Sequence, residues 1–145
     1  MAFAVALAGP ALLGCVGAAT AAPIERTLCL FDPVGANGMV AQQFQDYLIW
    51  ARSKGVDFKL TTYTDEGVVA KDLRARRCDA AGLTGIRTKQ FVDFAGSLDM
   101  VGGLQTYAQQ HTAIRVMASD KAADLMTEGP YAVAGVLPGG KVYLF

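Results

Sequence analysis

The sequence predicts an α/β fold with a mainly parallel, open sheet and flanking helices. Within about seventy residues, a short apolar segment is followed by an amphipathic one three times in succession. Glycine or polar turn residues follow each apolar segment, as expected where a strand leads into a helix. Strands that alternate with helices in this way are joined by crossover connections and run parallel.

The chain has 145 residues, with thirteen basic and thirteen acidic side chains. That length corresponds to one domain, which we place at residues 23–145. Because the net charge is zero and basic residues do not gather with aromatic ones, the composition does not favour a nucleic-acid partner or an anionic membrane surface.

Residues 1–22 differ from the rest, since they are apolar and carry no charge. They predict a signal peptide or a membrane anchor, although no basic residue opens the segment. The small residues Ala19–Ala21 fit a cleavage site, and Leu12–Cys15 is similar to a lipobox, which would make Cys15 a lipidation site. Either route predicts export to the periplasm, with membrane tethering in the second.

The first expected strand lies in 27–31 and ends at Asp32–Pro33, because proline cannot continue a sheet ladder. Gly35 and Gly38 permit a tight turn, and Asn37 is a candidate N-cap for the helix that follows. A glycine turn at the end of a strand, leading into a helix, predicts contact with a small polar or anionic ligand. The alternative is that both glycines serve only the turn.

Two further strand and helix pairs follow. An amphipathic helix is expected over 39–54 with Gly55 after it, then an alternating strand over 56–63. Asp65 is the candidate N-cap of the next helix, and the arginines at its end are explained by the helix dipole more simply than by phosphate binding. The third strand, 78–84, leads into a polar helical stretch that runs through Ala95.

The remaining chain is predicted to hold a glycine-rich connection over 96–103 and helical segments over 104–126, in two pieces. The only histidine, His111, is expected at the surface. A strand over 131–137, a turn at 138–140 and a last strand over 141–145 complete the pattern.

Outside the leader, two cysteines remain, Cys29 and Cys78. In an oxidising compartment they predict a disulfide, and two buried free thiols are the alternative. No histidine or third cysteine has the spacing of a metal site, so we expect neither a metal nor another cofactor.

Four blocks of the sequence resemble a bacterial family of periplasmic solute-binding proteins without a characterised ligand. The blocks are Leu28–Gly38, Thr62–Glu66, Cys78–Arg87 and Phe94–Asp99. The family is similar to the extracytoplasmic receptors of TRAP transporters. This resemblance implies lobe one of a type II periplasmic binding protein, in a chain truncated relative to the family's usual length, with membrane transporter subunits as partners.

The resemblance also implies a ligand site at the carboxyl edge of the sheet, where the loops after the three strands meet. The candidate residues are Asp32, Asn37, Gly38, Thr64, Asp65, Glu66, Thr84, Gly85 and Arg87. A carboxylate would suit Arg87, whose planar guanidinium can bind it through two hydrogen bonds. The acidic members could instead accept hydrogen bonds from an amine or from hydroxyl groups.

Two other classes stay open. The Gly35–Gly38 loop could belong to a small α/β enzyme or a nucleotide-binding domain, although the Walker lysine, a full dinucleotide motif and a placed general base are all missing from the sequence. The second class is a lipoprotein that is tethered to the membrane through Cys15 and binds no small ligand.

Overall fold

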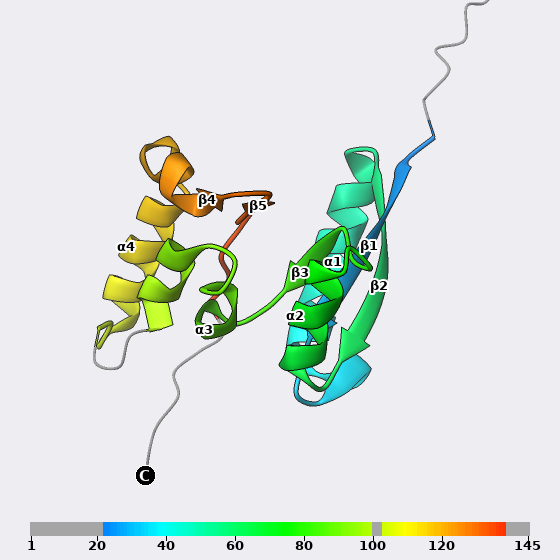
Figure 1. Ribbon diagram of the computed structural model, residues 1–145, viewed down its shortest axis with the longest axis horizontal. Helices are drawn as coiled ribbons and strands as arrows, with labels where there is room; N and C mark the ends of the chain where they lie inside the picture. The colour runs from blue at the N-terminus through cyan, green and yellow to red at the C-terminus, as the bar shows by residue number, and fades with distance from the viewer. Residues whose placement is uncertain (1–21, 100–102, 139–145) are drawn as a thin grey trace, which may run out of the picture.

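The computed structural model describes residues 22–99 and 103–138 of the chain (Figure 1). The expected leader at 1–22, with Cys15, lies outside these residues apart from Ala22. The expected turn at 138–140, apart from Pro138, and the expected strand at 141–145 lie outside them as well.

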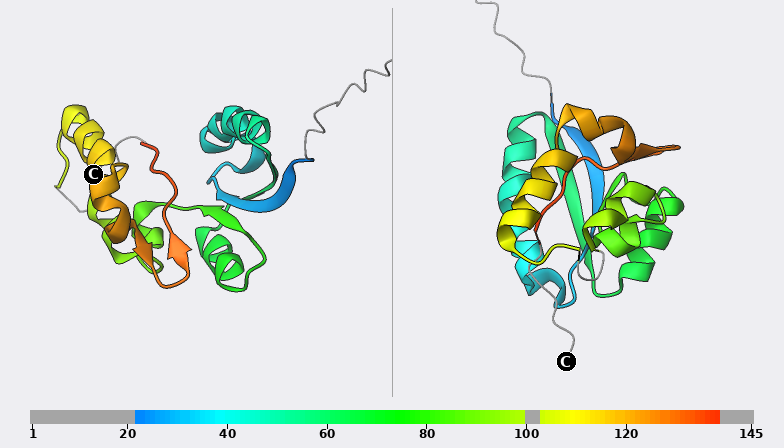
Figure 2. Two further views of the ribbon diagram at one scale, coloured as in Figure 1. Left: turned by 90° about the horizontal axis from the view of Figure 1, so that it is seen from above. Right: turned by 90° about the vertical axis from the view of Figure 1, so that its left-hand side faces the viewer.

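A three-stranded parallel sheet forms the first half of the molecule. Its strands are β1 (Ile24–Phe31), β2 (Val56–Tyr63) and β3 (Ala80–Gly82), in the order β2-β1-β3. Helices α1 (Met39–Ser53) and α2 (Glu66–Arg74) cover opposite faces of the sheet, as Figure 2 shows. The predicted α/β class, with a parallel open sheet and flanking helices, is confirmed.

Strand β1 is the centre of the packing because its side chains alternate between the two faces. Leu30 lies on the α1 face, and it leaves no room for a side chain at Gly82, whose side-chain carbon would lie 2.4 Å from Leu30 Cδ1 and 3.7 Å from Phe44 Cζ. On the other face, Cys29 packs with Val69 of α2. The Cys29–Cys78 disulfide is present and joins β1 to the turn that precedes β3.

The helix ends follow the sequence pattern with one correction. Asp65 is the N-cap of α2 and accepts a hydrogen bond from the Gly67 amide at 2.7 Å. Gly55, directly after the α1 C-cap, has a φ of +86°, which glycine adopts without strain. The prediction that Asn37 caps α1 is wrong: Asn37 ends the 3₁₀ helix η1 (Gly35–Asn37), and the N-cap is Gly38.

The second half of the molecule is mainly helical (Figure 1). Its elements are α3 (Gly85–Thr88), η2 (Asp93–Asp99), α4 (Tyr107–Met117), η3 (Asp120–Met126) and the short antiparallel strands β4 (Thr127–Glu128) and β5 (Tyr131–Ala132). It is held to the first half by an apolar cluster in which Ala70 of α2 packs with Phe91, Val92 and Ala95.

Three sequence predictions need correction in this half. The helical stretch after Thr84 is broken into α3 and η2, and η2 extends into the expected 96–103 connection. The expected strand over 131–137 is reduced to β5, because β4 pairs with only two of its residues. Beyond β5, Val133 and Val136 pack against Met117, Ala122 and Met126 instead. The helical prediction for 104–126, in two pieces, is confirmed by α4 and η3.

His111 lies in α4 and is exposed, as predicted. Within residues 22–99 and 103–138, no helix combines the length and apolar character that a membrane span requires.

Candidate functional site

The loops after the three parallel strands lie together at the carboxyl edge of the sheet. The loop after β1 approaches the loop after β2, since a side-chain carbon placed on Gly35 would lie 3.5 Å from Thr64 Cγ2. The loop after β2 contacts the loop after β3, since Glu66 Oε1 accepts a hydrogen bond from the Thr84 amide at 2.5 Å. In open α/β sheets, ligands bind at this edge, where the strand order reverses, which here is between β1 and β3.

Asp32 lies beneath this edge as an internal anion. Its side chain is 1% exposed, and its oxygens accept hydrogen bonds from the Val34 amide at 2.8 Å and the Ala41 amide at 3.0 Å. Chiefly the hydrogen bond from Ala41 holds the pKa of the Asp32 carboxyl below its usual value. Asp32 thereby fills the helix N-terminus that would otherwise meet an anionic ligand.

Gly38 is part of the same arrangement. A side-chain carbon at this position would lie 1.8 Å from Asp32 Oδ1, so only glycine fits while the carboxylate is in place. The Gly35–Gly38 loop therefore encloses the protein's own carboxylate, which disfavours a nucleotide phosphate in that place.

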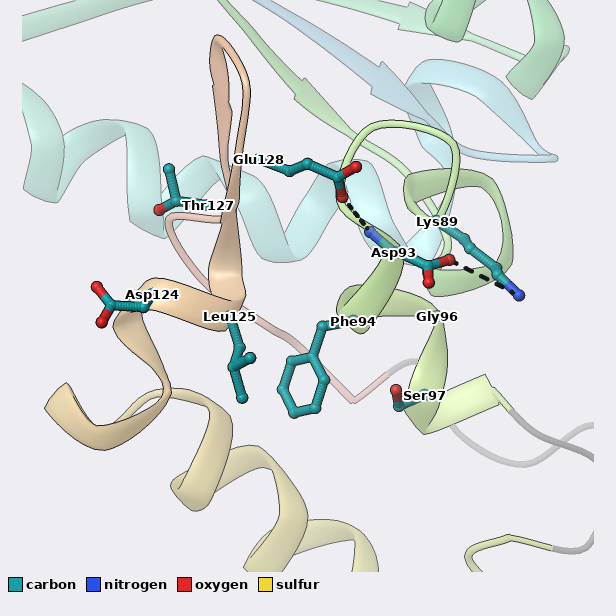
Figure 3. Close-up of a pocket in the computed structure, with 9 residues that line it drawn as sticks. All are labelled: Lys89, Asp93, Phe94, Gly96, Ser97, Asp124, Leu125, Thr127 and Glu128. Atoms are coloured by element: carbon teal, nitrogen blue, oxygen red, sulfur yellow. Dashed lines mark hydrogen bonds and ion pairs between the residues drawn. The ribbon is translucent and has the colours of Figure 1, made fainter.

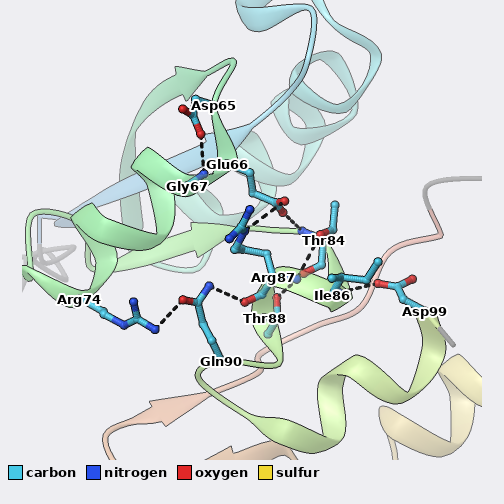
Figure 4. A network of polar contacts seen from close by, with 10 residues as sticks. All are labelled: Asp65, Glu66, Gly67, Arg74, Thr84, Ile86, Arg87, Thr88, Gln90 and Asp99. Atoms are coloured by element: carbon cyan, nitrogen blue, oxygen red, sulfur yellow. Dashed lines mark hydrogen bonds and ion pairs between the residues drawn. The ribbon is translucent and has the colours of Figure 1, made fainter.

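Of the remaining predicted residues, Asp65, Glu66, Thr84 and Arg87 belong to polar contacts around the starts of α2 and α3 (Figure 4). Glu66 accepts from the Thr84 amide with one oxygen, and its other oxygen lies 3.6 Å from Arg87 Nε. Thr84 is the N-cap of α3, and its hydroxyl accepts from the Arg87 amide at 3.3 Å. The structure thus brings Glu66, Thr84 and Arg87 into one cluster.

Asp99 belongs to this network and was not among the predicted residues. Its Oδ2 accepts a hydrogen bond from the Ile86 amide at 2.8 Å. The same oxygen would lie 2.2 Å from a side-chain carbon on Gly85, so this glycine allows the close approach. Asp99 is thirteen residues from Ile86, and no local sequence signal indicates the contact.

The predicted residues differ in their access to solvent. Asp32 and Gly38 are buried, whereas the following are exposed: Asn37, Thr64, Asp65, Thr84 and Arg87. Glu66 and Gly85 are intermediate. The backbone carbonyl of Asn37 accepts a hydrogen bond from the Gln42 side chain. The cluster of Glu66, Thr84 and Arg87, together with the neighbouring Asp65, therefore combines charge with access.

Comparison with known proteins shows the family to which the chain belongs. Residues 48–145 match the model of the family described as solute-binding protein AdeT 1/2. The chain belongs to this family. A relative from Acinetobacter baumannii, named "Probable solute-binding protein AdeT1", is 40% identical over 116 residues, which are 80% of this chain and 38% of the relative. The chain thus spans well under half of that relative's length, and no solved structure matches it.

Elsewhere on this AdeT-family chain, the described residues line two hollows of note. The larger, about 450 Å³, lies between η2 and the region of η3 and β4 (Figure 3). Phe94 and Leu125 supply its apolar lining, and Lys89, Asp93, Asp124 and Glu128 are among its polar lining residues. The smaller, about 280 Å³, lies around Met117 and Val133. No predicted ligand-binding residue lines either hollow.

The arginines at the end of α2 make contacts within the AdeT-family chain. Arg77 forms an ion pair with Asp72. Its hydrogen bond to the carboxylate is the main reason that the pKa of Asp72 lies below its usual value. Arg74 donates to Gln90 Oε1 at 2.5 Å and lies over the Phe91 ring. These contacts support the structural interpretation of Arg74 and Arg77 over phosphate binding.

Among the residues that the structure describes, no group of three or more His, Cys, Asp or Glu side chains could hold a metal ion.

Proposed function

We propose that this AdeT-family chain is lobe one of a type II periplasmic binding protein, similar to TRAP receptors, for a small polar ligand that bears a carboxylate. In this proposal the carboxyl edge of the sheet supplies part of the ligand's hydrogen bonds. A second lobe closes over the ligand by a hinge motion and supplies the rest. The protein binds its ligand and does not transform it.

The strand order supports this proposal. The order β2-β1-β3, with α1 and α2 on opposite faces, places a topological switch point between β1 and β3. The loops that border this point carry Thr84 and Arg87 on one side and Gly35–Gly38 on the other. The family match adds that the chain is related to solute-binding proteins.

The observation that carries the proposal is how the guanidinium nitrogens of Arg87 are paired. Its Nε faces Glu66 at 3.6 Å, and neither terminal nitrogen, Nη1 or Nη2, donates a hydrogen bond within residues 22–99 and 103–138. Two parallel N–H groups match the two oxygens of a carboxylate. Helix N-termini contribute less than the sequence predicted, because Asp32 and Asp65 already accept hydrogen bonds from the first turns of α1 and α2.

We further propose that residues 1–22 direct export to the periplasm and that the binding protein delivers its ligand to membrane transporter subunits. Cell fractionation with a Cys15→Ser variant separates the two export routes. Release of a soluble protein from the wild type fits cleavage after Ala21. Membrane retention that depends on Cys15 fits the lipidated alternative.

The direct test is a thermal-shift screen of the protein without its leader against small carboxylates, amines, sugars and nucleotides. A ligand that binds only the native state stabilises it by about 2.7 kcal/mol at one hundred times its dissociation constant. We expect carboxylates to raise the melting temperature. A shift confined to amines or sugars, or turnover of any compound, would contradict the proposal.

Arg87→Met gives the matching residue test. Loss of a charged hydrogen bond costs roughly 1.5–3 kcal/mol, so we expect the affinity for the active carboxylate to fall about ten- to a hundredfold. Arg52→Met is the control, because Arg52 is exposed in the last turn of α1, at the other end of the sheet. Equal losses in the two variants would rule out Arg87 as the contact.

A further inference from the structure

We infer that Glu66 is the specificity-determining residue of this edge: it holds Arg87 from the side and restricts the outer face of the guanidinium to acid groups of a single charge. This inference rests on the proposed function, because it concerns how the same arginine selects its ligand. Monocarboxylates would then be favoured over phosphate and other multiply charged anions.

The geometry gives Glu66 two separate tasks. Its Oε1 is committed to the Thr84 amide at 2.5 Å, which ties the start of α2 to the start of α3. Its Oε2 is left to face Arg87 Nε at 3.6 Å. Figure 4 shows the Arg87 side chain extending back toward Glu66. Because Nε is on the side of the guanidinium, this contact leaves the end formed by Nη1 and Nη2 open.

The backbone of Arg87 is held as firmly as its side chain. The Arg87 amide donates to Thr84 Oγ1, and the neighbouring Ile86 amide donates to Asp99. The Arg87 carbonyl accepts from Gln90 Nε2 at 2.8 Å. A ligand therefore meets an arginine whose backbone is fixed and whose guanidinium is paired with Glu66 before binding, which lowers the ordering cost of the contact.

The charges around Arg87 explain the selectivity. Glu66, whose side chain is 15% exposed, lies against the guanidinium, whose side chain is 46% exposed. Asp65 and Asp99 add negative charge at the neighbouring helix starts. Arg87 thus lies near three carboxylates, while Arg74, the other cation of this network, donates to Gln90. Each extra negative charge on a ligand is repelled by Glu66, whereas the two N–H groups can satisfy only one acid group.

Glu66→Gln separates the two tasks of this side chain. The amide oxygen of glutamine can still accept from Thr84, but its NH₂ group carries no negative charge to pair with Arg87 Nε. At about 4 Å in water, one unit charge changes the affinity for another about fivefold. We therefore expect the preference for inorganic phosphate relative to propionate to rise about fivefold in the Glu66→Gln variant.

The measurement is an NMR titration of the wild-type protein and the variant with propionate and with inorganic phosphate, followed at the Arg87 Nε–Hε resonance, which Arg87→Lys identifies by its loss. Glu25→Gln is the matched control, because Glu25 also pairs with a basic side chain, Lys59 at 3.2 Å, but does so at the opposite end of the sheet. The control should leave the anion preference unchanged.

The outcomes separate this inference from the proposed function. An unchanged phosphate-to-propionate ratio in Glu66→Gln, or an equal change in Glu25→Gln, overturns the inference. If neither anion shifts the Arg87 resonance in any variant, the assignment of Arg87 as the ligand contact fails. In that case the rate at which the Nε–Hε proton of Arg87 exchanges with solvent tests whether Glu66 contacts Nε. Faster exchange in Glu66→Gln supports this contact, and an unchanged rate overturns it.

Discussion

At the scale of single residues, a buried carboxylate organises the turn after β1. Asp32 accepts hydrogen bonds from amides on both sides of the turn, so one side chain caps α1 from nine residues away and closes the loop. A buried charge is tolerated only when hydrogen bonds replace its water. The Val34 amide in the turn and the Ala41 amide in the first turn of α1 supply those bonds, and the positive end of the helix dipole adds to them.

Replacement of Asp32 by asparagine should lower the melting temperature at neutral pH by several degrees, because an amide is a weaker acceptor and brings an unpaired NH₂ group into a buried site. Asp46→Asn, an exposed change on α1, the helix whose first turn Asp32 contacts, is the control and should have little effect. A variant as stable as the wild type would mean that Asp32 does not hold the turn.

The contribution of Asp32 should depend on pH. Since its folded pKa lies below the ordinary value of 3.8, the stabilisation is present above that value and is lost as the pH falls through the folded pKa. The stability difference between the wild type and Asp32→Asn should therefore shrink below about pH 4. Urea unfolding at a series of pH values measures it, and a difference that grows toward acid would contradict this account.

Gly38 should tolerate no side chain. In Gly38→Ala, the new methyl group would overlap the Asp32 carboxylate and force the turn apart, at a cost of roughly 1–3 kcal/mol in the free energy of unfolding. Gly135→Ala is the matched control, since no atom lies within 4 Å of the position that its side-chain carbon would occupy. Denaturant unfolding of both variants makes the comparison, and equal stabilities would show that the turn yields without cost.

At the scale of elements, local signals predicted most of the first half and long-range contacts decided the rest. Asp65 caps α2 within its own segment, so the sequence pattern was sufficient. Asn37 had the right residue type for a cap, but Asp32 reaches the first turn of α1 instead. The loops at the carboxyl edge followed from parallel strands. The pairing of Glu66 with Arg87 depends on how two loops meet, which periodicity does not encode.

The disulfide links two elements covalently, and its contribution to stability can be tested. It joins β1 to the turn before β3 across a sequence separation of 49 residues. By the loop-entropy model, its loss should reduce the free energy of unfolding by about 4 kcal/mol. Cys29→Ala/Cys78→Ala should therefore unfold at a clearly lower urea concentration than the wild type. A reductant should lower the wild-type midpoint and leave that of the double variant unchanged. A wild-type midpoint insensitive to reductant would contradict this prediction.

At the scale of the whole molecule, large apolar side chains are exposed on the outer side of α1. On α1, Ile49 is 71% and Trp50 55% exposed. Tyr47 links Trp50 to Phe58 of β2 through ring contacts at 5.7 and 6.2 Å. Exposed apolar surface of this kind lowers solubility when it is left uncovered.

Trp50 allows that exposure to be measured, because it is the only tryptophan in the chain. Its fluorescence in the isolated protein should lie close to that of free tryptophan and should be quenched readily by acrylamide. Trp50→Lys should reduce concentration-dependent aggregation, whereas Lys54→Ala, an exposed change at the end of the same helix, should not. A blue-shifted, poorly quenched emission would show that this surface is covered in solution.

The disulfide has a mechanical consequence as well. A force applied between the two ends of the chain cannot extend the segment between Cys29 and Cys78 while the bond is intact, because the load passes through the sulfur atoms. The 49-residue separation corresponds to roughly 170 Å of extended chain. A single-molecule pulling trace should therefore lengthen by about that amount when reductant is added, and α1, β2 and α2 lie within the shielded segment.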